Sequence, residues 1–373
     1  MKKKVLICFG TRPEAIKMCS LVHELRKDNT YIVKVCVTAQ HREMLDQVLD
    51  FFEVTPEYDL DIMKANQSLN ELSSRIFIKM EKVFNSFYPD LVLVHGDTTT
   101  SSVCAWASFN REIKVGHIEA GLRTFDKYSP FPEELNRQLT GKIADFHFAP
   151  TKMSQSNLLK EGVKKKNVTV TGNTVIDSLL WTVNKLESGF INKTIDEIKS
   201  KVDFSKKVIL VTAHRRENFG EGFLNICRAI KEISNVDNVE IVFPVHLNPN
   251  VQKPVNNLLS DLKNVHLVKP LDYPSFVWVM KKSTIIITDS GGVQEEAPSL
   301  GKPVLVMRET TERPEAVTAG TVKLVGANSD KIISKAKSLL FDASIYKEMS
   351  KAHNPYGDGN ANKRIIGFIK ENL

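Results

Sequence analysis

The chain has 373 residues, enough for two domains, and its 42% hydrophobic and 25% charged residues are ordinary for a globular protein. Its net charge of +7 comes from interspersed charges, with tight basic runs at Lys2–Lys4 and Lys164–Lys166, which favours an anionic small substrate over nucleic acid. No apolar run is long enough to span a membrane, and Gly10 ends the first one too early for a signal peptide. The five cysteines lack metal or CxxC spacing, so we predict a cytoplasmic protein without metal.

The first half of the chain alternates short apolar runs with helical patterns. The expected strands are 5–9, 32–38, 91–94, 115–118, 146–149 and 168–171, and helices are expected from about 12, at 40–52 and at 68–87. Arg12 and Lys17 lie at and just inside the carboxyl end of the first strand, where open α/β sheets bind ligands. Asp97 and Glu119 follow two later strands, and Glu133 follows the next loop. We therefore expect three carboxylates near two cations.

The second half restarts the same alternation. Its expected strands are 208–212, 239–245, 265–269, 285–287 and 303–307. Residues 188–206 are polar, lysine-rich and aperiodic, so we place the connection between domains at 172–206. The predicted domains are 1–171 and 207–357, with a closing helix at about 358–373 that packs back on the first domain. The fold class is α/β: two Rossmann-like, doubly wound parallel sheets with a central cleft.

The turn at Ser290-Gly291-Gly292 follows the apolar run 285–287 and precedes Glu295 and Glu296. Adjacent glycines let backbone N–H groups approach a ligand, and a helix N-terminus favours an anion. The turn therefore suggests a binding site for a nucleotide diphosphate. A glutamate there is also a suitable acceptor for ribose hydroxyls. The alternative is an ordinary strand-to-helix turn with acidic N-capping.

The sequence contains no GxGxxG after a strand, no P-loop, no HExxH and no zinc spacing, so we expect no cofactor. Among the histidines near strand ends, His214 is the candidate, because it lies beside Arg215, Arg216 and Asn218. Cations can stabilise a leaving phosphate, and crowding raises the pKa of at least one carboxylate, so that an acid stands beside a base. These residues alone leave elimination, hydrolysis and glycosyl transfer open.

The chain resembles the bacterial non-hydrolysing UDP-N-acetylglucosamine 2-epimerases from end to end. The motifs that carry the resemblance include GTRPEAIKM (10–18), VHGDTTT (94–100), GHIEAGLRT (116–124), SPFPEELNR (129–137), TAHRRENFG (212–220) and TDSGGVQEEAP (288–298). The resemblance implies the GT-B fold and reversible epimerisation at C2 of UDP-GlcNAc to UDP-ManNAc. It further implies anti elimination of UDP to 2-acetamidoglucal and re-addition, which supply ManNAc-type sugars for bacterial surface polysaccharide such as capsule.

The resemblance also implies roles for particular residues. The catalytic group would be Asp97, Glu119, Glu133 and His214. The substrate-binding group would be Arg12, Lys17, Asp97, Glu119, His214, Leu271, Phe276, Ser290, Gly291, Gly292, Glu296 and Arg313. Within it, Leu271 and Phe276 would flank the uracil. A second, allosteric UDP-GlcNAc site would use Gln40, Glu43, Gln67, Glu133, Arg215 and His246, although Glu43 and Asn66 replace a glutamine and an arginine found in some members. Members are commonly homodimers. The alternatives are a GT-B glycosyltransferase that uses a UDP-sugar, a hydrolysing epimerase that releases ManNAc and UDP, and a catalytically silent nucleotide-sugar sensor.

Overall fold

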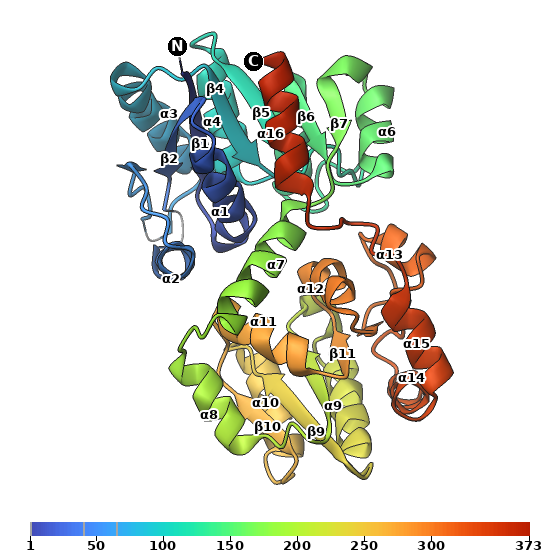
Figure 1. Cartoon of the computed structure of the whole chain (residues 1–373). Coiled ribbons are helices and arrows are strands. Elements are labelled where there is room, and N and C mark those ends of the chain that lie inside the picture. Colours follow the sequence, from blue (N-terminus) through green and yellow to red (C-terminus); the bar gives the residue numbers. More distant parts are fainter. Residues whose placement is uncertain (1, 40–41, 65) are drawn as a thin grey trace. The chain divides into compact units, whose positions relative to one another are not determined.

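The computed structural model describes residues 2–39, 42–64 and 66–373, and the chain divides into two compact units (Figure 1). Unit 1 comprises residues 1–181 and 356–373, and unit 2 comprises residues 182–355. The division falls within helix α7 (Thr174–Glu187). Each unit is built on its own parallel sheet.

Unit 1 holds a seven-stranded parallel sheet in the order β3-β2-β1-β4-β5-β6-β7. Its strands are β1 (Lys3–Phe9), β2 (Tyr31–Val37), β3 (Tyr58–Asp59), β4 (Leu91–His95), β5 (Lys114–Ile118), β6 (Phe146–Ala149) and β7 (Val168–Val170). The chain winds outward from β1 in one direction and then from β4 in the other. The loops after β1, β4 and β5 therefore lie side by side at the carboxyl edge of the sheet, where such sheets bind ligands.

The helices of unit 1 include one from the far end of the chain. They are α1 (Arg12–Lys27), α2 (Arg42–Phe52), α3 (Leu69–Ser86), α4 (Thr99–Phe109), α5 (Glu133–Ile143), α6 (Lys152–Lys160), the short η1 (Lys165–Asn167) and α16 (Ala361–Asn372). Helix α16 packs against α1, where Asn362 Nδ2 donates to Ser20 Oγ at 3.0 Å. Its Phe368 ring meets Phe146 and Phe148 of β6 edge-on, so the C-terminal segment completes the core of unit 1 (Figure 1).

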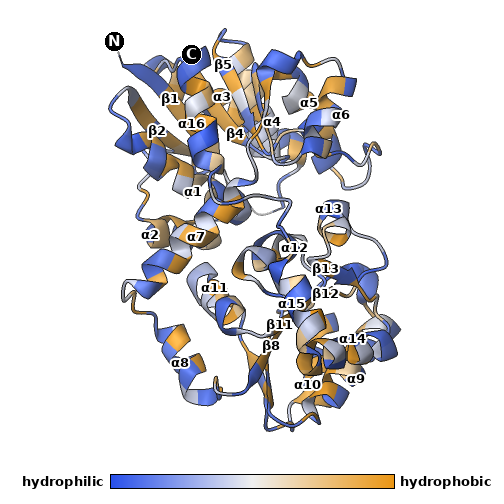
Figure 2. Ribbon diagram, turned by 45° about the vertical axis from the view of Figure 1, so that its right-hand side comes forward, coloured by the Kyte–Doolittle hydropathy of each residue, from blue (hydrophilic) through white to orange (hydrophobic). Residues whose placement is uncertain are grey.

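The core of unit 1 explains why its strands read as continuous apolar runs. Residues 5–9 and 91–94 have no solvent-exposed surface, because helices cover both faces of the sheet. Hydrophobic colouring in Figure 2 accordingly concentrates on the strands and on the helix sides that face them. Polar side chains that can reach a ligand are therefore expected in the loops that follow the strands, at the carboxyl edge of the sheet.

Unit 2 holds a six-stranded parallel sheet in the order β10-β9-β8-β11-β12-β13. Its strands are β8 (Lys207–Thr212), β9 (Val239–Pro244), β10 (Val265–Val268), β11 (Ile285–Thr288), β12 (Val304–Val306) and β13 (Val322–Leu324). The winding reverses between β8 and β11, so the loops after these two strands are neighbours. The predicted pair of doubly wound parallel sheets is confirmed.

The helices of unit 2 include one in a stretch whose sequence shows no helical pattern. They are α8 (Lys193–Lys201), η2 (Arg216–Asn218), α9 (Glu221–Ser234), α10 (Pro249–Leu259), α11 (Tyr273–Lys282), α12 (Gly291–Glu296), η3 (Ala297–Leu300), α13 (Pro314–Thr318), α14 (Ser329–Phe341) and α15 (Ala343–Lys351). Helix α8 lies in the stretch interpreted as aperiodic. Asn192 caps it by accepting from the Ile195 N–H, and Ile195 and Ile198 are the residues it buries. Two apolar residues among lysines are too few for the periodic pattern to be seen.

Candidate active site

The carboxyl edge of the unit 1 sheet brings together the acidic and basic residues expected there. Arg12 is the first residue of α1 after β1, Asp97 follows β4, and Glu119 follows β5 directly. Glu119 has a left-handed backbone, with φ of 62°, which is unusual for a residue other than glycine and is typical of functional sites.

Two groups hold the carboxylate of Glu119, whose side chain is nearly buried, and a third lies close to it. Lys17 forms an ion pair with Glu119 Oε2, and Asn173 Nδ2 donates to the same oxygen at 2.7 Å. Nε2 of the buried His95 lies 3.7 Å from it. Burial lowers the pKa of His95 to about 4, so its imidazole is neutral at physiological pH. Glu119 is therefore an ionisable group in a fixed position beside one lysine.

Asp97 occupies a partly buried position one loop away. It forms an ion pair with Arg137 of α5, and its backbone oxygen accepts from Asn136 Nδ2 at 3.0 Å. Burial raises the pKa of Asp97; Arg137 opposes the shift, and Glu119 and Glu133 add to it. Crowding thus acts in the predicted direction, although burial contributes most. The cluster presents a carboxyl group with a raised pKa near a second carboxylate.

Helix α5 begins with two glutamates that differ in their surroundings. Glu133 is partly exposed, whereas Glu134 is fully buried. Glu134 accepts from the backbone N–H groups of Thr124 and Phe125 at 3.0 and 3.2 Å, so it fixes the preceding loop. Of the pair, Glu133 is the one with a solvent-accessible side chain.

Glu14 is a buried carboxyl group that sequence reasoning did not select. Its Oε2 accepts from the N–H groups of Gly10 and Thr11 at 3.0 and 2.8 Å, and its Oε1 accepts from Thr98 Oγ1 at 2.7 Å. Burial raises its pKa to about 7. Glu14 joins the turn that carries Arg12 to the turn that carries Asp97. The capping-box pattern of Thr11 and Glu14 is the signal that could have identified it.

In unit 2, His214 follows β8 and contacts the carboxylate that follows β11. Nδ1 of His214 lies 3.2 Å from Oδ1 of Asp289, which is fully buried. The His214 ring stacks on His246, with centroids 5.7 Å apart and planes 20° apart. Burial lowers the pKa of His246, and its neighbour His214 adds to the effect. Asp289 lies in the motif TDSGGVQEEAP, but its partner is 75 residues away, and the motif alone indicates no role for it.

The Ser-Gly-Gly turn begins the six-residue helix α12, and Arg313 lies against it. Ser290 is the N-cap residue, and Gly291 lies so close to Arg313 that an added Cβ would stand 3.5 Å from its guanidinium carbon. Arg313 Nε donates to Glu295 Oε1 at 2.8 Å. Glu296 accepts from the Tyr273 hydroxyl at 2.8 Å. Both glutamates lie at the C-terminal end of α12, so the acidic N-capping alternative is wrong.

Leu271 and Phe276, expected beside a uracil, flank the start of α11. Leu271 is buried, and Phe276 is partly buried in the first turn of that helix. They lie in the same unit as the Ser-Gly-Gly turn and His214. Unit 2 therefore contains every residue that the sequence assigned to uracil, ribose and diphosphate.

The residues expected in a second ligand site are divided between the units. Gln40 lies outside the described residues. Glu43 is exposed on the first turn of α2, Gln67 accepts a hydrogen bond from Arg75, and Arg215 and His246 belong to unit 2. Glu133 is shared with the catalytic set.

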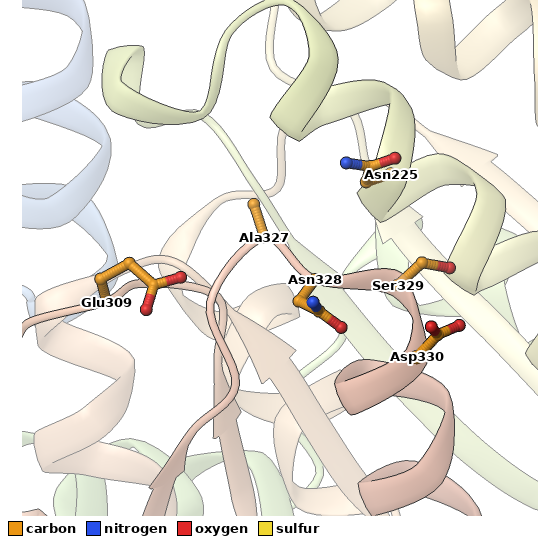
Figure 3. Close-up of a pocket in the computed structure, with 6 residues that line it drawn as sticks. All are labelled: Asn225, Glu309, Ala327, Asn328, Ser329 and Asp330. Carbon is orange, nitrogen blue, oxygen red and sulfur yellow. The ribbon is translucent and has the colours of Figure 1, made fainter.

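An open polar pocket of about 400 Å³ lies near the ends of β12 and β13 in unit 2 (Figure 3). It is lined by Asn225, Glu309, Ala327, Asn328, Ser329 and Asp330. None of the residues assigned from the sequence lines it. Among the described residues, no group of three or more His, Cys, Asp or Glu side chains is placed to hold a metal ion, and no helix is long and apolar enough to cross a membrane.

Two doubly wound parallel-sheet units with polar clusters at their carboxyl edges define a protein of the GT-B fold class. A family model described as UDP-N-acetylglucosamine 2-epimerase matches residues 23–370. The chain belongs to the UDP-N-acetylglucosamine 2-epimerase family and is an isomerase of that family.

Three relatives show the extent of the similarity. The UDP-N-acetylglucosamine 2-epimerase of Salmonella typhimurium is 56% identical over 369 residues, covering 98% of both chains. The crystal structure of UDP-GlcNAc 2-epimerase from Neisseria meningitidis bound to UDP-GlcNAc has 54% identity and a TM-score of 0.90, covering 99% of this chain and 100% of that one. The Methanocaldococcus jannaschii enzyme in complex with UDP-GlcNAc and UDP has 34% identity and a TM-score of 0.79, covering 99% of each.

Proposed function

We propose that the protein interconverts UDP-GlcNAc and UDP-ManNAc by anti elimination of UDP and its re-addition. The observation that carries this mechanism is the cluster of Asp97, Glu119 and Lys17 in unit 1, in which one carboxyl group has a raised pKa beside another carboxylate. Inversion at C2 needs a base on one face of the sugar and an acid on the other, and such a pair supplies both.

In the elimination, a carboxylate takes the proton from C2, the C2–H electron pair forms the C1=C2 double bond, and the C1–O bond breaks. UDP leaves with the electron pair of the C1–O bond. In the return step a carboxylic acid protonates the opposite face of C2, and a β-phosphate oxygen of UDP forms the new bond to C1. We assign the proton transfers to Asp97, Glu119 and Glu133, and substrate binding in unit 1 to Arg12 and Lys17.

Unit 2 would hold the UDP. Ser290, Gly291 and Gly292 supply backbone N–H groups for the diphosphate, and Arg313 beside Gly291 supplies a cation. Glu296 accepts from ribose hydroxyls, Leu271 and Phe276 flank the uracil, and His214 contacts the leaving phosphate. Related structures bound to UDP-GlcNAc, or to UDP-GlcNAc and UDP, support a nucleotide-sugar ligand for this chain.

The test is proton NMR of the purified protein with UDP-GlcNAc in D₂O, without acceptor, metal or NAD. We expect UDP-ManNAc with deuterium at C2, since the proton removed from C2 exchanges with solvent. If the products are free ManNAc and UDP, the protein is instead a hydrolysing epimerase. An unchanged spectrum would contradict the proposal and favour a glycosyltransferase or a sensor, which an acceptor screen would then separate.

We also infer a homodimer that pairs the exposed apolar side chains of α3 and α4. Ile78 and Phe109 are each 62% exposed and Trp106 is 49% exposed, so both helices expose large apolar side chains, and Phe77 meets Trp106 edge-on where the helices adjoin. Sedimentation of Trp106→Glu should give a monomer. The control Phe341→Glu changes a more exposed aromatic in unit 2, 67% exposed, and should leave the dimer intact.

A second UDP-GlcNAc that activates the enzyme is a further part of the proposal, with Gln40, Glu43, Gln67, Glu133, Arg215 and His246 as its ligands. Initial rates should then depend sigmoidally on UDP-GlcNAc. Arg215→Ala should abolish the sigmoidal dependence, because it removes a diphosphate contact. A hyperbolic wild-type curve would argue against activation.

The compartment we propose is the cytoplasm, where the product would supply surface-polysaccharide synthesis. All five cysteines are free and buried, which suits a reducing environment.

A further inference from the structure

Asp289 is a buried carboxylate whose contacts all lead to the segment that carries His214. It has no exposed surface. Its Oδ2 accepts from the backbone N–H groups of His214 and Arg215, each at 2.7 Å, and its Oδ1 lies 3.2 Å from Nδ1 of the His214 ring. One carboxylate therefore fixes the backbone of this segment and lies within ion-pair distance of the histidine ring.

The position of Asp289 is set by the sheet. It follows β11 directly, its own N–H donates to the backbone oxygen of Thr212 at 3.1 Å, and the hydroxyls of Thr212 and Thr288 are 2.6 Å apart. Strands β8 and β11 are hydrogen-bonded neighbours, so His214 and Asp289 meet because two adjacent strands end there. Little freedom remains for either group.

Asp289 is charged at neutral pH. Burial alone would raise its pKa, but the contacts with His214 and the backbone N–H of Arg215 outweigh burial and hold the pKa below its usual value. A carboxylate is an acceptor only, so the ring atom that faces it must carry a proton. The opposite nitrogen, Nε2, is the one left for a ligand, and the His214 side chain is 41% exposed.

We propose that Asp289 is a positioning residue that keeps the proton of His214 on Nδ1 and thereby presents Nε2 to the ligand. The inference rests on the proposed function in one respect, that the ligand at Nε2 is the diphosphate of UDP. In the neutral ring with its proton on Nδ1, Nε2 is unprotonated. When UDP binds, Nε2 takes a proton from solvent and donates it in a hydrogen bond to a phosphate oxygen, and the ring becomes a cation flanked by Asp289 and the phosphate.

Among the described residues, the ring of His246 stacks on His214, and Arg215 is the nearest cation in sequence. Neither offers an acceptor oxygen to Nδ1. Asp289 is thus the group that can select between the two neutral forms of the ring.

The first experiment measures the tautomer in the wild-type protein, by long-range ¹H–¹⁵N correlation spectroscopy with ¹⁵N-labelled histidine at pH 8. His214 is assigned as the signal set missing from His214→Gln. We expect a protonated Nδ1 and an unprotonated Nε2, and protonation of both nitrogens after UDP is added. A free protein with the proton on Nε2 would overturn the proposal without any variant of Asp289.

The second experiment uses Asp289→Asn, whose amide can accept from the backbone while turning an N–H toward Nδ1. We expect the ring to change to the Nε2–H form and kcat to fall by about 100-fold or more, with a smaller change in KM. An Asp289→Asn protein that keeps the proton on Nδ1 would show that Asp289 does not set the tautomer.

Asp342→Asn is the matched control, since Asp342 also accepts from two backbone N–H groups, those of Ser344 and Ile345, but touches no histidine in the described contacts. It should change neither the tautomer nor kcat. The NMR result depends on Asp289 alone, so it decides this inference even if the wild-type protein fails to epimerise UDP-GlcNAc.

Discussion

At the scale of single residues, the carboxylates of unit 1 differ more than their shared place at the sheet edge suggests. Glu119 is held by Lys17 and Asn173, whereas Asp97 is buried beside Arg137 and has a raised pKa. The raised pKa of Asp97 favours a protonated carboxyl group beside Glu119, which acid–base chemistry needs.

Replacing either carboxylate with its amide should therefore stop turnover while the fold survives. For Asp97→Asn and Glu119→Gln we expect kcat to fall by roughly 100- to 10,000-fold, the usual contribution of a general acid or base. Steady-state assays by NMR measure the loss, and circular dichroism checks the fold. Near-normal rates in both folded variants would show that neither residue transfers the proton.

Glu14 should make stability depend on pH. Its pKa is raised from 4.5 to about 7 by burial, so the folded state binds the proton more tightly than the unfolded state. Its stabilising effect is complete below pH 4.5 and is lost as pH rises to 7, on the order of 3 kcal/mol in total. Glu14→Gln resembles the protonated form and should lack this loss.

Urea unfolding of both proteins at pH 5 and pH 8 gives the comparison. The free energy of unfolding of the wild type, relative to that of Glu14→Gln, should be lower at pH 8 than at pH 5. Parallel behaviour of the two proteins would mean that Glu14 is ionised throughout.

At the scale of elements, the turn after β5 depends on a glycine that packs against α6. Gly121 has φ of +94°, and an added Cβ would lie 2.2 Å from the backbone oxygen of Ser154. Asn157 of the same helix donates to the Gly121 oxygen at 3.1 Å. The helix thus supports the turn that carries Glu119, two residues earlier.

Gly121→Ala should destabilise unit 1 by about 3 kcal/mol, because both the backbone conformation and the contact with Ser154 become unfavourable. Gly162→Ala is the matched control: its φ is +86° but nothing lies within 4 Å of the added Cβ. It should cost only about 1 kcal/mol. If both variants lose the same free energy of unfolding, the contact with Ser154 does not contribute to the cost of Gly121→Ala.

At the scale of the whole molecule, the two units should respond differently to acid. Among the described residues the fully buried histidines are His95, His117 and His147, and all three belong to unit 1. Burial lowers their pKa values to about 4, 3 and 4. Their contribution to stability is present above pH 6.5 and is lost as pH falls toward these values.

Hydrogen exchange followed by mass spectrometry at pH 7.5 and pH 5, corrected for intrinsic rates, measures this. Unit 1 should lose roughly 3 kcal/mol of opening free energy at pH 5, because the loss from three histidines exceeds the gain from Glu14. Unit 2 lacks a fully buried histidine among its residues and should change less. An equal or larger loss in unit 2 would contradict this explanation.

The sequence by itself determined the two doubly wound sheets and the residues at their carboxyl edges. Both depend on local pattern: a strand buried on two faces must be apolar throughout, and the first polar residues after it must lie at the sheet edge. Helix α8 was missed because its buried face is only Ile195 and Ile198.

Only the tertiary structure decided which groups meet. Asn173 reaches Glu119 across 54 positions, Asp289 reaches His214 across 75, and Lys17 reaches Glu119 across 102. Such pairs depend on the order of strands in the sheet and on side-chain burial, which leave no periodic signal in the chain. The proton affinities follow from the same contacts, since burial and partners, not residue type alone, set a pKa.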